Sequence, residues 1–350
     1  MIHPMNSPVR IIVVAPTWIG DAVMSLPLVG FLAGAQRVRL TVVARSRASR
    51  VYCGVDGVSD LIALAETGRL ERIWLETGLV RALHADGAVI LPPSFSRALS
   101  LVLAGVKVRA GVNADARRFL LTDSMTSRGL REEHLSENYL KLGRLLTDKL
   151  ALRCSHRFTV PKVKVFASDG EALARRFDKF GGKGEYVVVV PGATYGPTKS
   201  WPREKYSELV RRLSKDVLVV LAGSPSERDL CSSVGGGTAG VVNLAGETTL
   251  GEFIALLAGA RAVIANDSGS PHLAASLGVP VVVIFGSTSP QWTAPLGEEV
   301  HVVREPVPCS PCFRRECPTH LECYQGITVE KVLDTARLVL KKGIEKKESC

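Results

Sequence analysis

The chain has 350 residues, of which 46% are hydrophobic and 22% are charged, a composition typical of a globular protein with a large core. No apolar run reaches the ~18–20 residues of a membrane-spanning helix, and the first residues lack the pattern of a signal peptide. These features argue against a membrane-spanning or secreted chain, and they predict a cytoplasmic protein of two domains.

The net charge of +10 lies entirely in the first half of the chain. Residues 1–165 hold 23 Lys and Arg against 13 Asp and Glu, whereas residues 166–350 hold 21 of each. A basic half indicates an anionic partner, although a bias that favours solubility would look the same. Because aromatic residues are few and no nucleic-acid motif is visible, we expect no nucleic-acid partner.

Strands and helices alternate through the first half. Strands are predicted at 9–16, 39–44, 60–64, 87–91 and 106–111, and helices at 22–32, 77–85, 95–103 and 133–146. Residues 125–130 are predicted to be a loop. The alternation favours a parallel sheet covered by helices on both faces.

A helix predicted at 168–180 and a glycine-rich break at 181–184 precede a second alternation. Strands are predicted at 186–190, 217–222, 241–243, 262–265, 279–285 and 300–303, and helices at 203–213, 227–233, 249–258, 272–277 and 328–342. The predicted fold class is α/β, with two Rossmann-like domains. Their expected bounds are 1–165 and 185–327, joined by a linker at 166–184 and followed by a C-terminal helix and tail at 328–350.

The turn after the first strand contains Trp18, Gly20 and Asp21. Parallel α/β sheets bind ligands at the carboxyl ends of their strands. Gly20 permits a tight turn, and Asp21 begins a helix, where a carboxylate is stabilised by the helix dipole. Asp21 is therefore either a helix cap or a general base, and Trp18 either lines a pocket or packs against the domain.

The stretch 187–202, VVVVPGATYGPTKSWP, reads as a buried strand, a glycine-rich loop and the start of a helix. Backbone amides and a helix N-terminus at such a place bind anions, and Thr194, Thr198 and Lys199 add hydroxyls and a positive charge. We interpret the loop as a cradle for a diphosphate. The alternative is an ordinary strand-to-helix loop, since neither a Walker A motif nor GxGxxG is present.

Further polar loops follow other strands of the second half. Glu227 is placed to accept ribose hydroxyls or is simply an acid in the first turn of a helix. Thr249 lies on the next loop and is a weaker candidate. The loop at 286–290 is also polar, so several polar loops are expected at one edge of the second sheet.

The loop that begins at residue 266 opens a helix. The backbone amides of Ser268 and Gly269 can bind phosphate oxygens, Asp267 can hold sugar hydroxyls, and His272 can donate to a phosphate. The alternatives are an Asx cap for Asp267 and a buried, satisfied imidazole for His272.

Four clustered cysteines, Cys309, Cys312, Cys317 and Cys323, have spacings of two, four and five residues. Together they could supply four thiolates to a zinc ion. Free thiols and a disulfide are the alternatives, and a disulfide is disfavoured in the cytosol.

Four segments resemble glycosyltransferase family 9 in the order in which the family has them. They are PTWIGDAVMSLPL (16–28), PGATYGPTKSWP (191–202), NDSGSPHLAASLGVPVVVIFGSTSP (266–290) and PCSPCFRRECPTHLECY (308–324). The resemblance implies the GT-B fold, in which two Rossmann-like domains with parallel sheets face an interdomain cleft. In that fold the first domain binds the acceptor and the second binds the nucleotide-sugar donor.

The resemblance also implies an inverting transfer of L-glycero-D-manno-heptose from ADP-heptose to the first heptose of the lipopolysaccharide inner core. It assigns Asp21 as the base, beside Trp18 and Gly20 on the acceptor side. It assigns a set of donor-binding residues in the second domain: Thr194, Thr198, Lys199, Glu227, Thr249, Asp267, Ser268, Gly269 and His272. Lys199 would neutralise the departing ADP. The chain departs from the family at Ser270 and Pro271, where relatives usually carry bulky apolar residues.

No metal cofactor is expected, because no DxD-like pair of carboxylates stands near the phosphate loops. The implied acceptor is the anionic lipid A-core glycolipid, which a basic first domain suits. The same charge suits peripheral contact with the inner face of the inner membrane, and Arg residues within 97–131 are expected to serve acceptor binding.

Two other readings remain open. One is a heptosyltransferase with a different acceptor or another nucleotide-sugar enzyme of this fold, such as an epimerase, which needs no acceptor-side base. The other is a zinc-stabilised binding module without catalytic turnover.

Overall fold

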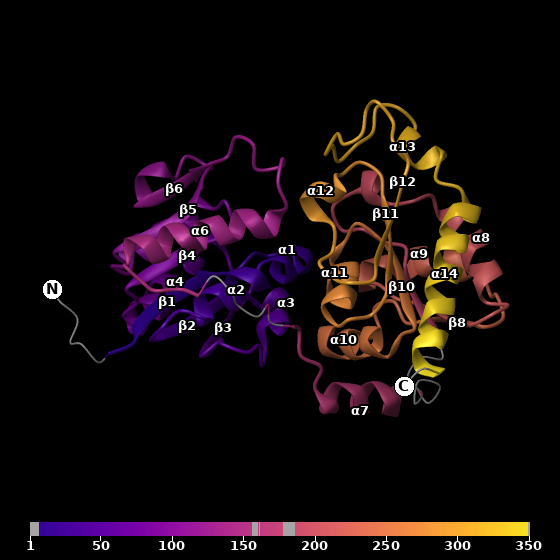
Figure 1. Ribbon diagram of the computed structural model, residues 1–350, viewed down its shortest axis with the longest axis horizontal. Helices are drawn as coiled ribbons and strands as arrows, with labels where there is room; N and C mark the ends of the chain where they lie inside the picture. The colour runs from indigo at the N-terminus through magenta and orange to yellow at the C-terminus, as the bar shows by residue number, and fades with distance from the viewer. Residues whose placement is uncertain (1–6, 156–159, 161, 178–185, 349–350) are drawn as a thin grey trace. The chain divides into compact units, whose positions relative to one another are not determined.

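The computed structural model describes residues 7–155, 160, 162–177 and 186–348 (Figure 1). The predicted break at 181–184 and the end of the helix predicted at 168–180 lie outside these residues. The chain forms two compact units, Met1–Lys164 and Val165–Cys350.

The first unit is built on a parallel sheet of six strands in the order β3-β2-β1-β4-β5-β6. The strands are β1 (Val9–Val14), β2 (Val38–Arg45), β3 (Asp60–Leu64), β4 (Gly87–Ile90), β5 (Val108–Asn113) and β6 (Asp123–Thr126). The helices are α1 (Ile19–Met24), α2 (Leu26–Ala33), α3 (Ser46–Ser49), η1 (Arg50–Tyr52), α4 (Arg69–Leu83), α5 (Phe95–Leu103), η2 (Arg118–Leu120) and α6 (Leu135–Lys149). The apolar run of β1 is buried because helices cover both faces of the sheet.

Two predictions for this unit are wrong. Residues 123–126 form the edge strand β6, although the loop predicted at 125–130 begins within it. Helix α4 begins at Arg69 rather than at residue 77. The sequence does not predict its first half, because the apolar side chains there do not form a stripe that faces the core.

The second unit has a parallel sheet in the order β12-β11-β10-β7-β8-β9. Its strands are β7 (Tyr186–Val190), β8 (Leu218–Leu221), β9 (Val241–Asn243), β10 (Ala262–Asn266), β11 (Val281–Phe285) and β12 (Val300–Arg304). Its helices are α7 (Ala167–Arg176), η4 (Pro197–Lys199), α8 (Arg203–Leu213), η5 (Pro225–Glu227), α9 (Arg228–Gly235), α10 (Leu250–Gly259), α11 (Gly269–Ser276), α12 (Pro290–Thr293), α13 (Glu322–Gln325) and α14 (Val329–Glu348).

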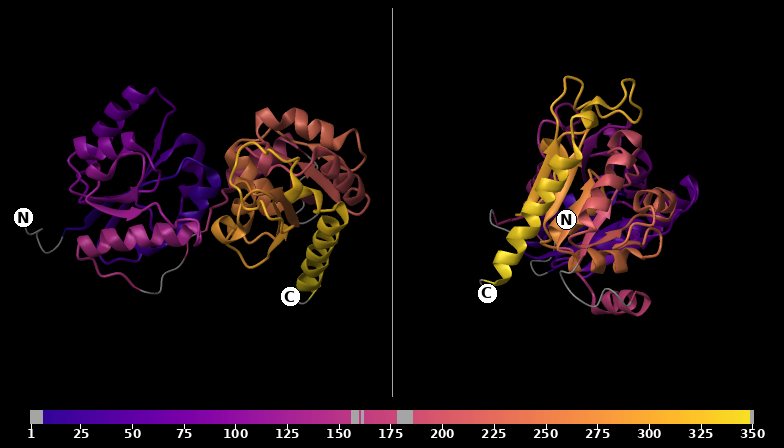
Figure 2. Two further views of the ribbon diagram at one scale, coloured as in Figure 1. Left: turned by 90° about the horizontal axis from the view of Figure 1, so that it is seen from above. Right: turned by 90° about the vertical axis from the view of Figure 1, so that its right-hand side faces the viewer.

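Two helices at the ends of this unit pack on its other helices. On α7, Arg176 lies 3.4 Å from the carboxylate of Glu252 on α10. The long α14, yellow in Figure 2, lies along the unit and packs against α8.

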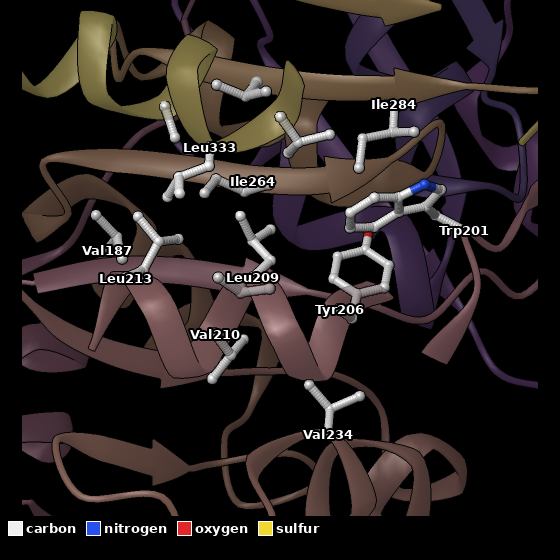
Figure 3. Close-up of a cluster of buried hydrophobic side chains, with 14 of the residues drawn as sticks. Val187, Trp201, Tyr206, Leu209, Val210, Leu213, Val234, Ile264, Ile284 and Leu333 are labelled. Atoms are coloured by element: carbon white, nitrogen blue, oxygen red, sulfur yellow. The ribbon is translucent and has the colours of Figure 1, made fainter. Parts of the chain in front are cut away.

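The core of the second unit lies between α8, the sheet and α14 (Figure 3). The rings of Trp201 and Tyr206 meet edge to face, with centroids 5.0 Å apart. Leu209 and Leu213 continue this face of α8 towards the strands. The helix therefore presents one buried apolar stripe and an exposed face rich in charge.

Among the described residues, no helix combines the length and the apolar character that crossing a bilayer requires.

Parallel pairing gathers the carboxyl ends of the strands at one edge of each sheet. In the first unit the chain order reverses between β1 and β4, and in the second it reverses between β7 and β10. Such reversal points are where open α/β sheets bind ligands. The loops after β1, β7 and β10 all lie at these points, and the predicted gathering of polar loops at one edge of the second sheet is confirmed.

Candidate functional site

A nearly buried ion pair lies at the reversal point of the second sheet. Lys199 ends the short helix after β7, Asp267 follows β10, and Lys199 Nζ lies 2.7 Å from Asp267 Oδ2. The Thr288 hydroxyl, on the loop after β11, donates to the same oxygen at 2.6 Å. Since the two charged side chains are only 17% and 4% exposed, their positions are fixed and little screened by water.

A second cation lies near this pair. The ring of Tyr195 has Lys199 Nζ 5.1 Å and Arg315 Cζ 5.2 Å from its centroid. The Tyr195 hydroxyl donates to the Phe313 carbonyl at 3.0 Å, which holds the segment around residue 313 beside the loop after β7. The ring thus gathers two positive charges where an anion would bind. No local pattern in the sequence identifies Tyr195 as this organiser.

Asn266 holds the site together, a role that the sequence does not reveal. Its Oδ1 accepts from the backbone N–H of Trp201 at 3.0 Å and from the Tyr206 hydroxyl at 3.0 Å. Its Nδ2 donates to the Pro191 carbonyl at 2.7 Å. One buried amide therefore ties the end of β10 to both ends of the loop after β7.

Glu227 is brought against the loop after β7. A Cβ at Gly192 would lie 1.9 Å from Glu227 Oε1, so this approach requires glycine. The other carboxylate oxygen accepts from the backbone N–H and the hydroxyl of Ser224, both at 2.7 Å. Glu227 is therefore held by a capping box, and its carboxylate also faces the loop after β7.

The three candidate threonines have different surroundings. Thr198 is buried, and its hydroxyl donates to the Arg314 carbonyl. Thr249 is the N-cap of α10 and accepts from the backbone N–H of Glu252 at 3.2 Å. Thr194 is exposed in the turn of the loop after β7.

Helix α11 begins at the candidate donor loop. Ser268 is its N-cap, and within the described residues the buried Ser268 hydroxyl has no hydrogen-bond partner. Gly269 begins the first turn, and His272 is buried in it. The N-terminus of α11 therefore presents amides and a positive dipole end next to Asp267.

The acceptor-side candidates lie at the reversal point of the first sheet. Trp18 is the half-exposed N-cap of α1, Gly20 is buried, and Asp21 lies in the first turn. Burial raises the pKa of Tyr52 and Tyr139 well above the ordinary range, and the charge of Asp21 raises both further. Asp21 therefore lies within electrostatic reach of two neutral, buried phenols.

Three of the arginines within 97–131 are committed to the fold. Arg97 pairs with the buried Glu76, and Arg117 donates to the carbonyl oxygens of Pro92 and Val112. Arg109 donates to the carbonyl oxygens of residues 106, 107 and 120. The remaining three are exposed, namely Arg118, Arg128 and Arg131.

The clustered cysteines are free thiols. Cys309 is exposed and Cys323 is buried, and burial together with the other three thiols raises the pKa of Cys323 to about 11. In the part of the chain that the structure describes, no three His, Cys, Asp or Glu side chains are close enough together to hold a metal ion. As they lie, the four cysteines do not form a ready zinc site.

Two Rossmann-like units, one with cations and a helix N-terminus at its reversal point, define an enzyme that handles a nucleotide-linked anion. The sequence profile of glycosyltransferase family 9 (heptosyltransferase) matches residues 78–322. The chain is 30% identical over 312 residues to lipopolysaccharide heptosyltransferase 2 of Escherichia coli K12, covering 84% of this chain and 88% of that protein.

The solved structure of E. coli ADP-heptose lps heptosyltransferase II matches with a TM-score of 0.79 at 27% identity, over 95% of this chain and 99% of that one. A family 9 glycosyl transferase from Veillonella parvula shares the fold, with a TM-score of 0.81 at 18% identity over 96% and 98% of the two chains. The chain belongs to glycosyltransferase family 9, and it is a glycosyltransferase with the GT-B fold.

Proposed function

We propose that the protein transfers L-glycero-D-manno-heptose from ADP-heptose to the first heptose of the lipopolysaccharide inner core. The names of its relatives support ADP-heptose as the donor and lipopolysaccharide as the acceptor. The observation that carries the proposal is the Lys199–Asp267 pair at the reversal point of the second sheet, beside the N-terminus of α11. This arrangement suits a diphosphate attached to a sugar.

In this proposal the second unit binds the donor and the first binds the acceptor. Lys199 and the α11 amides hold the diphosphate, with Thr194 and Thr198 in the same loop. Glu227 takes the ribose hydroxyls, and Asp267 and His272 hold the sugar-phosphate end. Thr249 lies at the next loop. Trp18 and Gly20 shape the acceptor side next to Asp21.

Inversion follows from a single displacement. The acceptor hydroxyl oxygen attacks the anomeric carbon of the heptose as its proton passes to the Asp21 carboxylate. The bond between that carbon and the phosphate oxygen breaks, and ADP leaves with the electron pair. The charge that develops on ADP meets donors already in place, so they stabilise the transition state more than the bound donor.

We further propose that the acceptor is the anionic lipid A-core glycolipid, reached at the inner face of the inner membrane from the cytoplasm. The excess positive charge of residues 1–165 supports this partner. No metal cofactor is proposed, since the phosphate loops carry no DxD-like pair, and the free cysteine cluster is assigned no zinc.

The test is to incubate the protein with ADP-heptose, first alone and then with a core glycolipid that carries one heptose. We expect ADP release and a product heavier by one heptose only when the acceptor is present. Conversion of ADP-heptose without acceptor would indicate an epimerase-like enzyme instead. Binding of zinc in equal amount without turnover would indicate a binding module.

A further inference from the structure

Helix α4 turns an apolar face outward. Leu70, Trp74, Leu75 and Leu79 are 75%, 71%, 51% and 44% exposed. The four side chains span the exposed half of the helix, and the exposed residues Gly78, Ala82 and Glu71 lie between them. Ordinary protein surfaces expose apolar residues singly and scattered, whereas this helix exposes one tryptophan and three leucines together.

The orientation of this helix is fixed from its other side. The Glu76 carboxylate is 1% exposed and pairs with Arg97 of α5. The Thr77 hydroxyl donates to the Ser100 carbonyl at 3.4 Å, also on α5. Turning α4 to bury its leucines would pull Glu76 away from Arg97 and leave a buried charge without its partner, which is strongly unfavourable. The apolar face is therefore held outward.

The chemistry around this face fits a membrane surface. On the exposed half of α4, Arg81 and Glu71 carry opposite charges, while Arg72 lies on the side of the buried Glu76 and donates to the Thr67 carbonyl at 2.7 Å. The unit to which α4 belongs holds the whole net charge of the chain. Basic residues attract anionic lipid headgroups, while Trp and Leu enter the boundary between headgroups and acyl chains.

The position of α4 also fits such contact. It follows β3, which runs parallel to β1, so its N-terminus lies at the same sheet edge as α1 and Asp21. Resting on the proposed function, which takes a lipid-anchored acceptor, we propose that the exposed face of α4 docks on an anionic bilayer. Leu70, Trp74, Leu75 and Leu79 enter the interface and bring the acceptor edge of the first unit to the membrane.

The test measures binding to vesicles of phosphatidylethanolamine and phosphatidylglycerol, with neutral phosphatidylcholine vesicles for comparison. We expect Trp74→Ser/Leu75→Ser to lower partition onto the anionic vesicles roughly tenfold or more, because two large apolar side chains leave the interface. Leu70→Ser/Leu79→Ser tests the face independently. All four positions are exposed, so the core should stay intact, and circular dichroism checks this.

The matched control is Leu338→Ser on α14, since Leu338 is 51% exposed, as Leu75 is. It should bind vesicles like the unsubstituted protein. A blue shift of tryptophan emission on anionic vesicles, absent in Trp74→Phe, would place Trp74 itself in the interface. Equal vesicle binding by all variants would overturn the proposal. So would a dimer that the α4 variants break while no form of the protein binds vesicles.

Activity separates this proposal from the function on which it rests. The α4 variants should transfer heptose normally to an acceptor stripped of its acyl chains, and about tenfold more slowly to the acceptor embedded in vesicles. If the unsubstituted protein transfers heptose to neither acceptor, the proposed function fails while vesicle binding still decides the role of α4. Equal rates of variant and unsubstituted protein on both acceptors would overturn the role of α4 alone.

Discussion

Lys199 is held in place by groups that leave it little freedom. Asp267 and the Tyr195 ring position its ammonium group, which is mostly buried. We expect Lys199→Ala to weaken ADP binding roughly 10- to 100-fold and to slow transfer, because a hydrogen bond to a charged group contributes about 1.5–3 kcal/mol. Titration calorimetry with ADP and initial rates with saturating donor measure the two effects.

Lys215→Ala is the control for this substitution. Lys215 is exposed in the turn before β8, at the opposite edge of the sheet. Its replacement by Ala removes the same charge as Lys199→Ala. If both variants bind ADP equally well, Lys199 has no part in holding the diphosphate.

Asp21 is the carboxylate proposed as the general base. It lies in the first turn of α1 and acts electrostatically on Tyr52 and Tyr139. We expect Asp21→Asn to reduce turnover about 100-fold or more, because the acceptor hydroxyl loses its base. The affinity for ADP, which the second unit is proposed to bind, should not change.

Asp56→Asn is a suitable comparison, since Asp56 is an exposed acid of the same unit that pairs with Lys164. Turnover of Asp21→Asn equal to that of Asp56→Asn would remove Asp21 as the base.

At the scale of elements, burial decided which features the sequence could predict. Strands buried on both faces, such as β1 and β7, read as continuous apolar runs and were predicted at nearly their observed bounds. Edge strand β6 has the polar sequence DSMT, so no such run marks it. The sequence does not mark the first half of α4 as a helix, because its apolar residues face outward and its Glu76 faces inward.

The connection between β7 and β10 depends on one amide. Asn266→Ala would leave the Trp201 N–H, the Tyr206 hydroxyl and the Pro191 carbonyl without their partner. We expect the free energy of unfolding to fall by about 3 kcal/mol or more, since each buried polar group left without a hydrogen bond costs about 1–3 kcal/mol. Urea unfolding followed by tryptophan fluorescence measures the change.

Asn243→Ala is the matched control for Asn266→Ala. Asn243 is a half-buried asparagine of strand β9, with hydrogen bonds to Ser232 and Ala245. Its loss should cost about 1 kcal/mol, because water can replace its partners. An equal loss of stability in the two variants would show that the hydrogen bonds of Asn266 contribute no more to stability than those of a half-buried asparagine.

At the scale of the whole molecule, the sequence predicts which loops gather at the candidate site but not how their side chains pair. Lys199 and Asp267 were each singled out, yet nothing in a linear pattern says that residues 68 apart share a hydrogen bond. The sequence predicts no role for Tyr195 or Asn266, because their roles depend on tertiary neighbours. The charge distribution, in contrast, can be predicted from the sequence, but only by counting along the whole chain, which shows the excess of positive charge in residues 1–165.

That concentration of charge leads to a prediction in which the structure selects the residues. Arg118, Arg128 and Arg131 are exposed. Arg128 and Arg131 follow the carboxyl end of β6, at the sheet edge where α1 begins, and Arg118 lies in the connection from β5 to β6. Replacing all three by Ala should raise the KM for the glycolipid acceptor about 3- to 100-fold, because exposed charge pairs contribute about 0.2–1 kcal/mol each. The KM for ADP-heptose should stay constant.

Salt distinguishes an electrostatic role from a local change of shape. Raising the ionic strength should increase the acceptor KM of the unsubstituted protein and bring it towards that of the triple variant, because salt screens exposed charges. The matched control replaces Arg175, Lys215 and Lys341, three exposed cations of the second unit, and removes the same net charge. If this control raises the acceptor KM equally, total charge rather than the acceptor edge of the first unit attracts the glycolipid. A rise in the KM for ADP-heptose instead would place the three arginines on the donor side.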